Sequence, residues 1–552
     1  MRIAVVGAGI SGLVAAYRLR KALGPKLELV LLERSERIGG ILRTDDIAGE
    51  PVDLGAEAFV GRRPEIPALL GELGLADQLV YPAGKRPLVW SGGAAHPLPE
   101  RTLMGIPAGP DALAGLVDEA TLAWIADEPA RPLDWVPGGD MAVGELVAAR
   151  FGEQVVRRSV DPLLGGVYAG LANSIGVRAA LPPLAAALDA GAASLSQAVA
   201  DALPPPSTAP VFGGIRDGYR VLLEALLNAA APRLETGCAP AQLTRTAHGW
   251  RLDLVDEQGT AGKLGTAGKV GTAGELGPAG QVGATRERRA AGQVGAAGER
   301  GAAGQVGAAG ERGAAGQVGA AGEREAAGQV GAAGERGGAG QRGAAGELNT
   351  VGELAMVGEL DAVVLATPAP VTASLLRGVA PAAAAAMAGI ELSSSAVVAL
   401  ALPPDTPLPD NSGILVATGE PLHAKAFTLS SRKWPHLAAR DVALVRASFG
   451  RFGDDSLLSW SDDDLIAAAA TDLSTVTGVP ITPITARVQR WHGGLPQYAP
   501  GHLDRVAAIE AGLADLPGLA VAGAYLHGVG VPACAASGTA AAEAVLADLT
   551  RL

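Results

Sequence analysis

Cysteine is scarce in this chain. Its 552 residues include two cysteines, Cys238 and Cys534. Two thiols cannot form a disulfide framework, and such usage is typical of proteins from reducing compartments. We therefore expect a cytoplasmic protein. Export is the alternative, because Arg2 precedes an apolar run, but glycines interrupt that run and no clear cleavage site follows it.

The chain also lacks long apolar runs and an excess of positive charge. No stretch of about 18 apolar residues is free of charge and glycine, so we expect no transmembrane segment. Residues 381–402 come nearest and read as a helix followed by a strand. A peripheral membrane contact remains compatible with the sequence. Lysine and arginine total 44 against 57 acidic residues, a net charge of −13, which argues against nucleic-acid binding.

Proline is nearly absent from residues 259–358, although glycine recurs there at almost every third position. A stable collagen triple helix needs roughly 15–20% proline or hydroxyproline, and this tract contains only Pro278. We expect a low-complexity Gly-X-Y insertion that is disordered, and a trimerising collagen-like segment is the alternative. Residues 249–255 and 360–368 read as strands at the edge of one sheet, with their connection expanded by the insertion.

The N-terminus carries the first chemical signal. Residues 2–6 read as a buried strand, the motif Gly7-Ala8-Gly9-Ile10-Ser11-Gly12 follows, and residues 13–21 are helical in character. In such a unit the first glycine permits a tight turn, the second lets a pyrophosphate approach the backbone, and the third allows close helix packing. Free N–H groups at the helix start attract phosphate, and we expect Ser11 to cap this helix.

An acidic residue completes the unit. A second strand, residues 27–32, ends in Glu33, about twenty residues beyond the last glycine, where a carboxylate accepts hydrogen bonds from a ribose diol. The order of strand, glycines, helix, strand and acid predicts a dinucleotide site. A glycine turn without a ligand is the alternative.

Further glycine blocks favour a flavin over a nicotinamide. Gly39-Gly40 and Arg43 come after the acid, and Gly55-Ala56-Glu57 follows another expected strand. Near the C-terminus, an expected strand over 519–525 leads through Gly528–Pro532 into an expected helix over 534–549. A second helix N-terminus preceded by glycines suits a cofactor held at both ends, whereas a soluble nicotinamide usually needs one such turn.

These motifs resemble those of the monoamine oxidase-like and phytoene desaturase-like FAD superfamily. More specifically, the chain is similar to the FAD-dependent porphyrinogen oxidases of haem biosynthesis. The similarity is carried by blocks spread over most of the sequence, namely His96-Pro97-Leu98-Pro99, Met104-Gly105-Ile106-Pro107, residues 161–170, Arg490-Trp491 with Leu495–Tyr498, Gly501-His502-Leu503, and residues 528–534 with Ser537-Gly538.

The resemblance implies a fold of mixed class, α/β with α+β. A Rossmann-like FAD-binding domain would be assembled from separate pieces, and a substrate domain with a helical subdomain would fill the gaps. The expected FAD-binding pieces are residues 1–75, 212–258, 359–367 and 516–552. The mainly helical substrate subdomain would be 76–208, the substrate-binding domain 368–515, and the insertion 259–358.

The resemblance also implies site residues. For the flavin these are Gly7, Gly9, Ser11, Gly12, Glu33, Arg34, Gly39, Gly40, Arg43, Gly55, Ala56, Glu57, Gly523, Val529, Gly530 and Val531. For the substrate they are Arg62, Arg63, Gly166 and Tyr168. The two arginines would fork onto a propionate, or are solvated loop charges. Trp491 and Tyr498 face the pocket or are core aromatics. No catalytic side chain and no metal site are expected, because the flavin supplies the chemistry.

The activity that the resemblance implies is the six-electron oxidation of coproporphyrinogen III to coproporphyrin III. FAD would take hydride from the substrate, O2 would reoxidise the flavin to give hydrogen peroxide, and the product would pass to other enzymes of haem biosynthesis. The alternatives are a protoporphyrinogen IX oxidase, an amine oxidase or carotenoid desaturase, and a non-enzymatic glycine-repeat interaction protein.

The insertion gives a first test. Deletion of residues 259–359 is expected to leave the flavin bound, because a loop tip tolerates changes of length. The absorbance of the purified deletion variant measures this. A variant that is soluble but colourless would contradict the interpretation of the tract as an insertion.

Overall fold

The computed structural model describes residues 1–205, 207, 209–255, 261–262 and 359–551. It divides into one unit of Met1–Arg251 with Glu359–Leu552 and another of Leu252–Gly358. In the second unit, the end of β14 (Trp250–Val255) pairs antiparallel with β15 (Ala261–Gly262). The rest of the expected Gly-X-Y insertion lies outside the described residues. Everything below concerns the first unit.

A five-stranded parallel sheet contains the two strands that flank the predicted dinucleotide motif. Its strands in spatial order are β12 (Arg233–Glu235), β2 (Glu28–Leu32), β1 (Arg2–Val6), β17 (Ala362–Leu365) and β23 (Leu519–Val521). All four neighbouring pairs are parallel. Central strands of this kind are buried on both faces, which explains their nearly continuous apolar sequences. The predicted Rossmann-like, mixed α/β fold class is confirmed.

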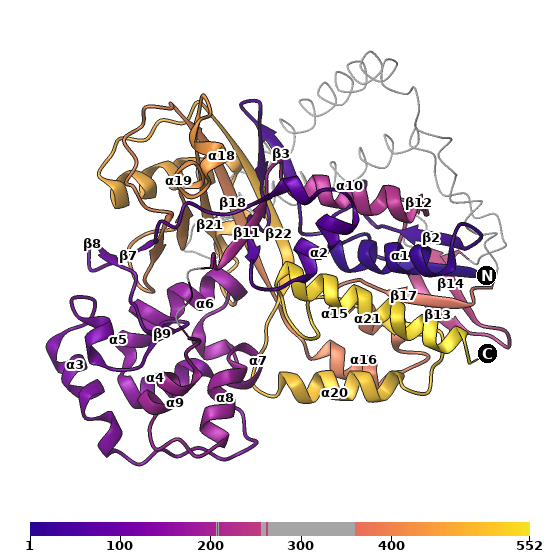
Figure 1. Ribbon diagram of the computed structural model, residues 1–552, viewed down its shortest axis with the longest axis horizontal. Coiled ribbons are helices and arrows are strands. Elements are labelled where there is room, and N and C mark those ends of the chain that lie inside the picture. The colour runs from indigo at the N-terminus through magenta and orange to yellow at the C-terminus, as the bar shows by residue number, and fades with distance from the viewer. Residues whose placement is uncertain (206, 208, 256–260, 263–358, 552) are drawn as a thin grey trace, which may run out of the picture. The chain divides into compact units, whose positions relative to one another are not determined.

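Helices from distant parts of the chain pack beside this sheet (Figure 1). They are α1 (Ile10–Leu23), α2 (Glu65–Glu72), α10 (Tyr219–Ala230) and α21 (Val531–Leu549). Apolar side chains of the sheet and these helices share one buried cluster that includes Val5, Leu13, Leu222 and Val545. The first helix of the chain therefore packs against the last one, and the sequence ends meet at one layer. Elsewhere, α15 (Ala369–Leu376) packs against α16 (Pro381–Ala388), which in turn contacts α20 (His502–Leu513).

A second, seven-stranded sheet is mostly antiparallel. In spatial order it contains β22 (Thr485–Pro496), β18 (Leu392–Leu402), β21 (Ala443–Phe449), β20 (Ala426–Thr428), β19 (Gly413–Val416), β7 (Leu88–Ser91) and β8 (Ala94–Pro97). Helix α19 (Asp462–Thr477) covers one face through a shared apolar cluster. The short helices α17 (Ser430–Lys433) and α18 (Pro435–Ala438) contact this sheet at β21.

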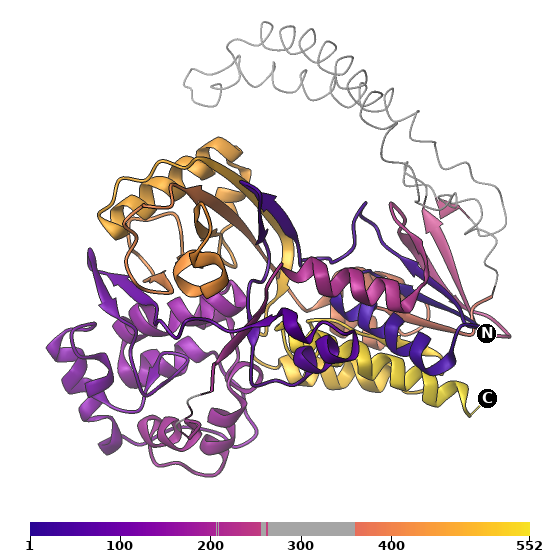
Figure 2. The same cartoon turned by 45° about the horizontal axis from the view of Figure 1, so that its top comes forward.

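A helical group contains most of the chain between β8 and β11, and Figure 2 shows it as a separate body of ribbons beside the seven-stranded sheet. Its helices are α3 (Glu119–Ala126), α4 (Val143–Phe151), α5 (Glu153–Val155), α6 (Asp161–Tyr168), α7 (Val177–Ala180), α8 (Pro182–Asp189) and α9 (Leu195–Ala202). The hairpin of β9 (Thr102–Leu103) and β10 (Ile106–Pro107) joins it.

Short strands connect these layers. The hairpin of β3 (Thr44–Ile47) and β4 (Glu50–Asp53) follows β2 in the chain. Strand β11 (Phe212–Ile215) lies between β5 (Phe59–Val60) and β6 (Leu79–Val80). Strand β13 (Pro240–Arg245) precedes β14. Among the described helices, none is both long enough and apolar enough to cross a membrane.

Several expected boundaries need correction. The segment after the insertion, expected at a sheet edge, forms β17, which lies inside the parallel sheet between β1 and β23. Leu360 meets the strand before the insertion through two backbone hydrogen bonds of 2.8 and 2.9 Å with Trp250. Strand β23 ends at Val521, earlier than expected, and α21 begins at Val531, earlier than the expected Cys534. The glycines and Pro532 there suit a first helical turn.

Candidate functional site

The glycine turn between β1 and α1 is shaped by three different constraints. Gly7 has φ +100°, and a Cβ there would lie 2.6 Å from the carbonyl oxygen of Ala366. A Cβ on Gly12 would overlap the carbonyl oxygen of Gly7. Gly9 caps α1 without a side-chain hydrogen bond, and a Cβ on it would have no described atom within 4 Å. Gly7 and Gly12 thus serve the fold, while Gly9 faces open space at the helix N-terminus.

The second glycine pair lies directly on this turn. The Gly39 N–H donates to the Ala8 carbonyl oxygen at 2.8 Å, and Gly39 forms a parallel bridge with Gly9. A Cβ on Gly40 would lie 3.3 Å from the Gly9 Cα. Both glycines have positive φ, which only glycine adopts without strain. The structure therefore brings the two predicted glycine blocks together around the start of α1.

Arg37 fixes this second turn, and the sequence analysis missed it. Its guanidinium donates to the Gly40 carbonyl oxygen at 2.6 Å and lies 5.6 Å from the ring centroid of Trp491. Burial lowers the pKa of Arg37. Trp491 is itself held by an N–H bond of 2.9 Å to the Leu54 carbonyl oxygen. The predicted flavin ligand Arg34 is instead exposed at the surface.

Glu33 reaches back from the end of β2 to the glycine turn. One carboxylate oxygen accepts the Ala8 N–H at 2.9 Å, and the other accepts from the N–H and hydroxyl of Ser35 at 2.9 and 2.8 Å. The carboxylate is partly buried and fixed in position. A carboxylate can accept about four hydrogen bonds, so capacity for a ribose hydroxyl remains at this position.

The N-terminus of α21 lies beside that of α1. The Ser11 hydroxyl donates to the Cys534 carbonyl oxygen at 2.9 Å, and a Cβ on Gly538 would overlap the Ser11 carbonyl oxygen. Gly530 caps α21 with no side-chain hydrogen bond and is exposed. The expectation that Ser11 caps α1 is wrong, because Gly9 occupies the cap and Ser11 lies inside the first turn. Its hydroxyl joins the two helices instead.

Gly55 and Glu57 are held by cations from the seven-stranded sheet and α17. Arg446 on β21 donates to the Gly55 carbonyl oxygen at 2.5 Å and lies 3.7 Å from the Glu57 carboxylate. Lys433 pairs with Glu57 at 2.8 Å, and the Ser430 hydroxyl also donates to it. Burial alone would raise the pKa of Glu57, but Lys433 and Arg446 lower it to about 2. Glu57 is therefore an ionised carboxylate matched by two cations.

Two more predicted residues have structural partners nearby. Arg43 donates to the Gln489 side-chain oxygen at 2.6 Å and to the Asp45 carboxylate at 2.8 Å. Ala56 packs against the apolar cluster around the parallel sheet. Arg43 thus links the segment after the glycine pair to β22 of the seven-stranded sheet.

The turn that leads into α21 is also fixed. The Gly523 N–H donates to the Ser537 hydroxyl at 3.0 Å. Gly523 has φ +152°, and a Cβ on it would lie 2.7 Å from the Tyr525 ring. Val531, the first residue of α21, is buried in the cluster around the parallel sheet. This turn is therefore placed by both the sheet and the helix that follow it.

Tyr168 joins the helical group to this C-terminal turn. Its ring lies 5.6 Å from that of Tyr498, and its carbonyl oxygen accepts from the Gln497 side chain at 2.8 Å. The Tyr498 hydroxyl donates to the Ala524 carbonyl oxygen at 2.6 Å. Val529 packs against the apolar cluster that contains both tyrosines. Tyr498 is 2% exposed, which identifies it as a core aromatic.

The remaining predicted substrate residues, Gly166, Arg62 and Arg63, are exposed. Gly166 lies within α6, so its glycine does not break the helix, and it is exposed with no described atom within 4 Å of an added Cβ. Arg62 and Arg63 are exposed in the loop after β5. Arg63 pairs with Glu65, only two positions away. Tyr168 thus packs against the segment that leads into α21, and Arg62 and Arg63 lie at the surface between β5 and α2, both of which contact α21.

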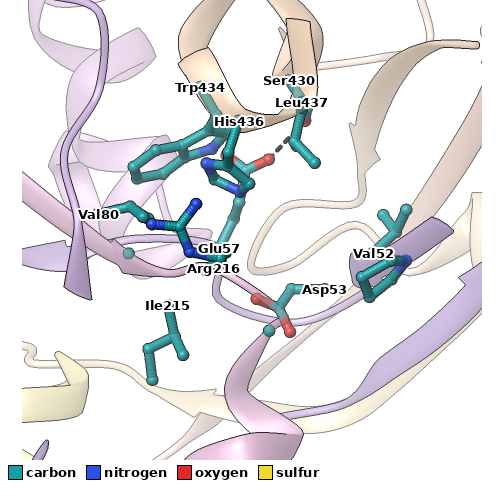
Figure 3. A pocket seen from close by; sticks show the side chains of 13 residues that line it. Val52, Asp53, Glu57, Val80, Ile215, Arg216, Ser430, Trp434, His436 and Leu437 are labelled. Atoms are coloured by element: carbon teal, nitrogen blue, oxygen red, sulfur yellow. Dashed lines mark hydrogen bonds between the residues drawn. The ribbon is translucent and has the colours of Figure 1, made fainter. Parts of the chain in front are cut away.

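A small pocket lies next to Glu57 (Figure 3). It is lined by residues of β4, β11, α17 and α18 and of the turn before α10. The lining residues that carry charge or hydrogen-bonding side chains are Asp53, Glu57, Arg216, Ser430, Trp434 and His436. Apart from Glu57, a predicted flavin residue, no sequence motif indicates this pocket, because its walls come from segments almost 400 residues apart.

Two pocket residues have strongly shifted acidities. Burial raises the pKa of Asp53 to about 7, although the Thr44 hydroxyl and the Tyr219 N–H both donate to its carboxylate, at 2.6 and 3.1 Å. Burial and the neighbouring Arg216 and Arg440 lower the pKa of His436. Near neutral pH, His436 is therefore an uncharged imidazole, and a large fraction of Asp53 is protonated.

The geometry fits a bound dinucleotide cofactor. Two helix N-termini without side-chain caps lie close together beside the open space at Gly9. The Glu33 carboxylate lies where it could accept a hydrogen bond from a ribose hydroxyl. Phosphate binds at such helix ends because of the free N–H groups and the helix dipole. A cofactor extending from Gly9 toward Gly530 would meet protein from both ends of the chain.

Comparisons with known proteins agree with this geometry. A family described as flavin containing amine oxidoreductase matches residues 10–278 and 342–546. A protein of Mycobacterium tuberculosis named coproporphyrinogen III oxidase is 45% identical over 545 residues, covering 99% of this chain and 97% of its own length. A protein of the same name from Propionibacterium freudenreichii is 30% identical and covers 99% and 90%.

Solved structures share the fold. A protoporphyrinogen oxidase-like protein of Exiguobacterium sp. 255-15 covers 100% of this chain and 99% of its own, with a TM-score of 0.72 and 24% identity. The cyclohexylamine oxidase of Brevibacterium oxydans gives a TM-score of 0.59 at 14% identity, with coverages of 100% and 99%. At these identities the likeness concerns the fold alone.

Proposed function

Because the chain belongs to the flavin containing amine oxidoreductase family, we propose that it oxidises coproporphyrinogen III to coproporphyrin III with O2 as acceptor. The predicted FAD cofactor and oxidoreductase class are confirmed by that membership. The observation that carries the substrate is the relative of that name, which is 45% identical across 97% of its own length. A protoporphyrinogen oxidase of Arabidopsis thaliana matches only 33% of this chain, so protoporphyrinogen IX is the second candidate.

The flavin, when bound, accepts hydride from the substrate and delivers the electrons to O2. The chain's own residues bind and orient it. Gly9 would leave room for the pyrophosphate, the α1 and α21 N-termini would donate N–H groups to it, and Glu33 would accept from the ribose. Arg446 holds the Gly55 carbonyl oxygen and thereby fixes the backbone from Gly55 to Glu57, which would contact the flavin. These residues, with the others predicted for the cofactor, form the proposed FAD site.

We propose the domain division of the sequence analysis as well. Each of its FAD-binding pieces contributes at least one strand to the parallel sheet, which supports this division. On the substrate side, Tyr168 and Gly166 on α6 would line the pocket for the tetrapyrrole, and Arg62 or Arg63 would bind one of its propionates. We place the reaction in the cytoplasm, where the product would pass to another enzyme of haem biosynthesis.

The test is a direct comparison of substrates. The purified, flavin-loaded protein is given coproporphyrinogen III, protoporphyrinogen IX or a primary amine, and peroxide release and porphyrin fluorescence are followed under air. We expect the highest initial rate with coproporphyrinogen III, with three peroxides formed per porphyrin because six electrons leave in pairs. Peroxide from the amine alone would overturn the proposal. A faster rate with protoporphyrinogen IX would favour the second candidate.

A further inference from the structure

The pocket beside Glu57 holds hydrogen-bonding groups that the protein leaves unused. The Trp434 side chain is 2% exposed, and its indole N–H is buried without a hydrogen-bond partner. The Nδ1 atom of His436 is likewise buried and unpartnered. Buried polar atoms are almost always hydrogen-bonded in folded proteins. Two such atoms, on neighbouring side chains that line one pocket, are available to bind a ligand there.

A guanidinium accompanies these two groups. Arg216 lines the same pocket, and no hydrogen bond or ion pair of its side chain is found among the described residues. Figure 3 shows the Arg216 guanidinium, the His436 ring and the Trp434 indole gathered at one end of the pocket, with Asp53 at the other. An indole N–H and a guanidinium only donate, and imidazole donates from Nδ1 in one tautomer. These three groups therefore suit a ligand that accepts hydrogen bonds.

The charges around the pocket favour an anion. Glu57 is neutralised by two cations, Lys433 at 2.8 Å and Arg446 at 3.7 Å. Arg440, which also acts on His436, is paired with Glu50 at 2.7 Å. Asp217 also acts on His436, but the exposed guanidinium of Arg216 has no bonded counter-ion among the described residues. Arginine matches the two oxygens of a carboxylate with parallel N–H donors.

The fold is built to hold the indole in place. A Cβ on Gly214 of β11 would lie 2.6 Å from the Trp434 ring. The glycine thus lets the ring lie directly on the strand, and Lys433 sits 4.9 Å from the ring centroid on α17. A donor fixed by packing is pre-organised, which reduces the entropy lost when a ligand binds.

We propose that this pocket is a carboxylate-binding subsite in which Arg216, the Trp434 N–H and His436 hold the ligand. A propionate arm of the tetrapyrrole is one source of the carboxylate, and a small free carboxylate is the other. The first source rests on the proposed function, because only a porphyrinogen oxidase would meet that arm.

The test uses the flavin-loaded protein with two variants and a control. Arg216→Gln removes the exposed guanidinium, and Trp434→Phe removes the N–H while keeping an aromatic ring. Arg377→Gln changes an exposed arginine outside the pocket. Coproporphyrin III binding is measured by fluorescence titration. The indole N–H resonance of Trp434, assigned by its loss in Trp434→Phe, is followed during titration with sodium propionate.

We expect Arg216→Gln to weaken coproporphyrin III binding about 10- to 100-fold, the range for one charge-assisted pair. We also expect propionate to shift the Trp434 resonance in wild type and Arg377→Gln but not in Arg216→Gln. A propionate-induced shift with unchanged coproporphyrin III binding would assign the pocket to a free carboxylate. No shift, together with equal porphyrin binding in wild type and Arg216→Gln, would overturn the subsite.

These outcomes are separable from the proposed function. If wild type oxidises no porphyrinogen but propionate still shifts Trp434 through Arg216, the proposed function fails and the subsite stands. If wild type oxidises coproporphyrinogen III and Arg216→Gln matches it in binding and KM without any propionate shift, the function stands and the subsite fails.

Discussion

Replacing Gly9 by alanine is expected to empty the protein of flavin while leaving it folded. A Cβ at this position meets no described protein atom within 4 Å, so the polypeptide itself has room for it. The space it would fill is the one that a pyrophosphate needs at the N-terminus of α1. Losing even one charge-assisted hydrogen bond to phosphate weakens binding at least about tenfold. The ratio of flavin to protein absorbance after purification measures the effect.

Gly12→Ala is the informative contrast. A Cβ on Gly12 would overlap the Gly7 carbonyl oxygen, so this variant should lose thermal stability in the apoprotein as well as flavin. Gly71→Ala is the matched control, since Gly71 is exposed on α2 and an added Cβ has open space. It should bind flavin normally and gain up to about 1 kcal/mol from helix propensity. Full flavin content in Gly9→Ala would contradict the assignment of this turn to the pyrophosphate.

The difference between these glycines shows what the sequence could predict. The motif assigns separate roles to Gly7, Gly9 and Gly12, and the structure places close neighbours at the first and third but none at the second. Such short-range geometry follows from a strand that turns directly into a helix, because each residue's surroundings are set by a few neighbours in the chain. The bounds of strand β1 match the prediction, and those of β2 and α1 lie within a few residues of it.

Contacts between distant segments could not be predicted in this way. The Ser11 hydroxyl bonds to the Cys534 carbonyl oxygen, 523 positions away, so no local pattern distinguishes it from a helix cap. Arg34 and Arg37 have similar sequence surroundings, yet only Arg37 turns inward to Gly40. The direction of a side chain in a short loop depends on packing against β22, which is encoded more than 400 residues later.

The same limit applies to charge. Arg62 and Arg63 were chosen for the substrate because they follow a family motif, but they lie at the surface. The cations that meet Glu57 are Lys433 and Arg446, and they do so only after the seven-stranded sheet has formed. Arg216 and Trp434 lie outside every motif found in the sequence. A sequence shows that a cation exists, while burial beside a carboxylate depends on the tertiary fold.

Asp53 should make the stability of this protein fall as pH rises from about 4 to about 7. Its pKa is about 7 in the folded protein, raised by burial from the ordinary value of 3.8. Between these two values the folded state keeps a proton that the unfolded chain has lost, so each step up in pH favours unfolding. Above pH 7 both states are ionised and the contribution becomes constant. The whole change amounts to an upper bound of about 4 kcal/mol.

Asp53→Asn replaces the titrating carboxyl group by an amide of nearly the same shape. The asparagine oxygen can still accept from the Thr44 hydroxyl and the Tyr219 N–H, which now donate to the carboxylate. The variant should therefore match wild type near pH 4 and become more stable than wild type by pH 8. Urea unfolding midpoints of the flavin-loaded proteins, taken from pH 4 to 8, give the comparison. Asp405→Asn, at an exposed position, should follow the wild-type curve. Parallel curves for Asp53→Asn and wild type would mean that Asp53 is already ionised in the folded protein below pH 5, with its hydrogen bonds outweighing its burial.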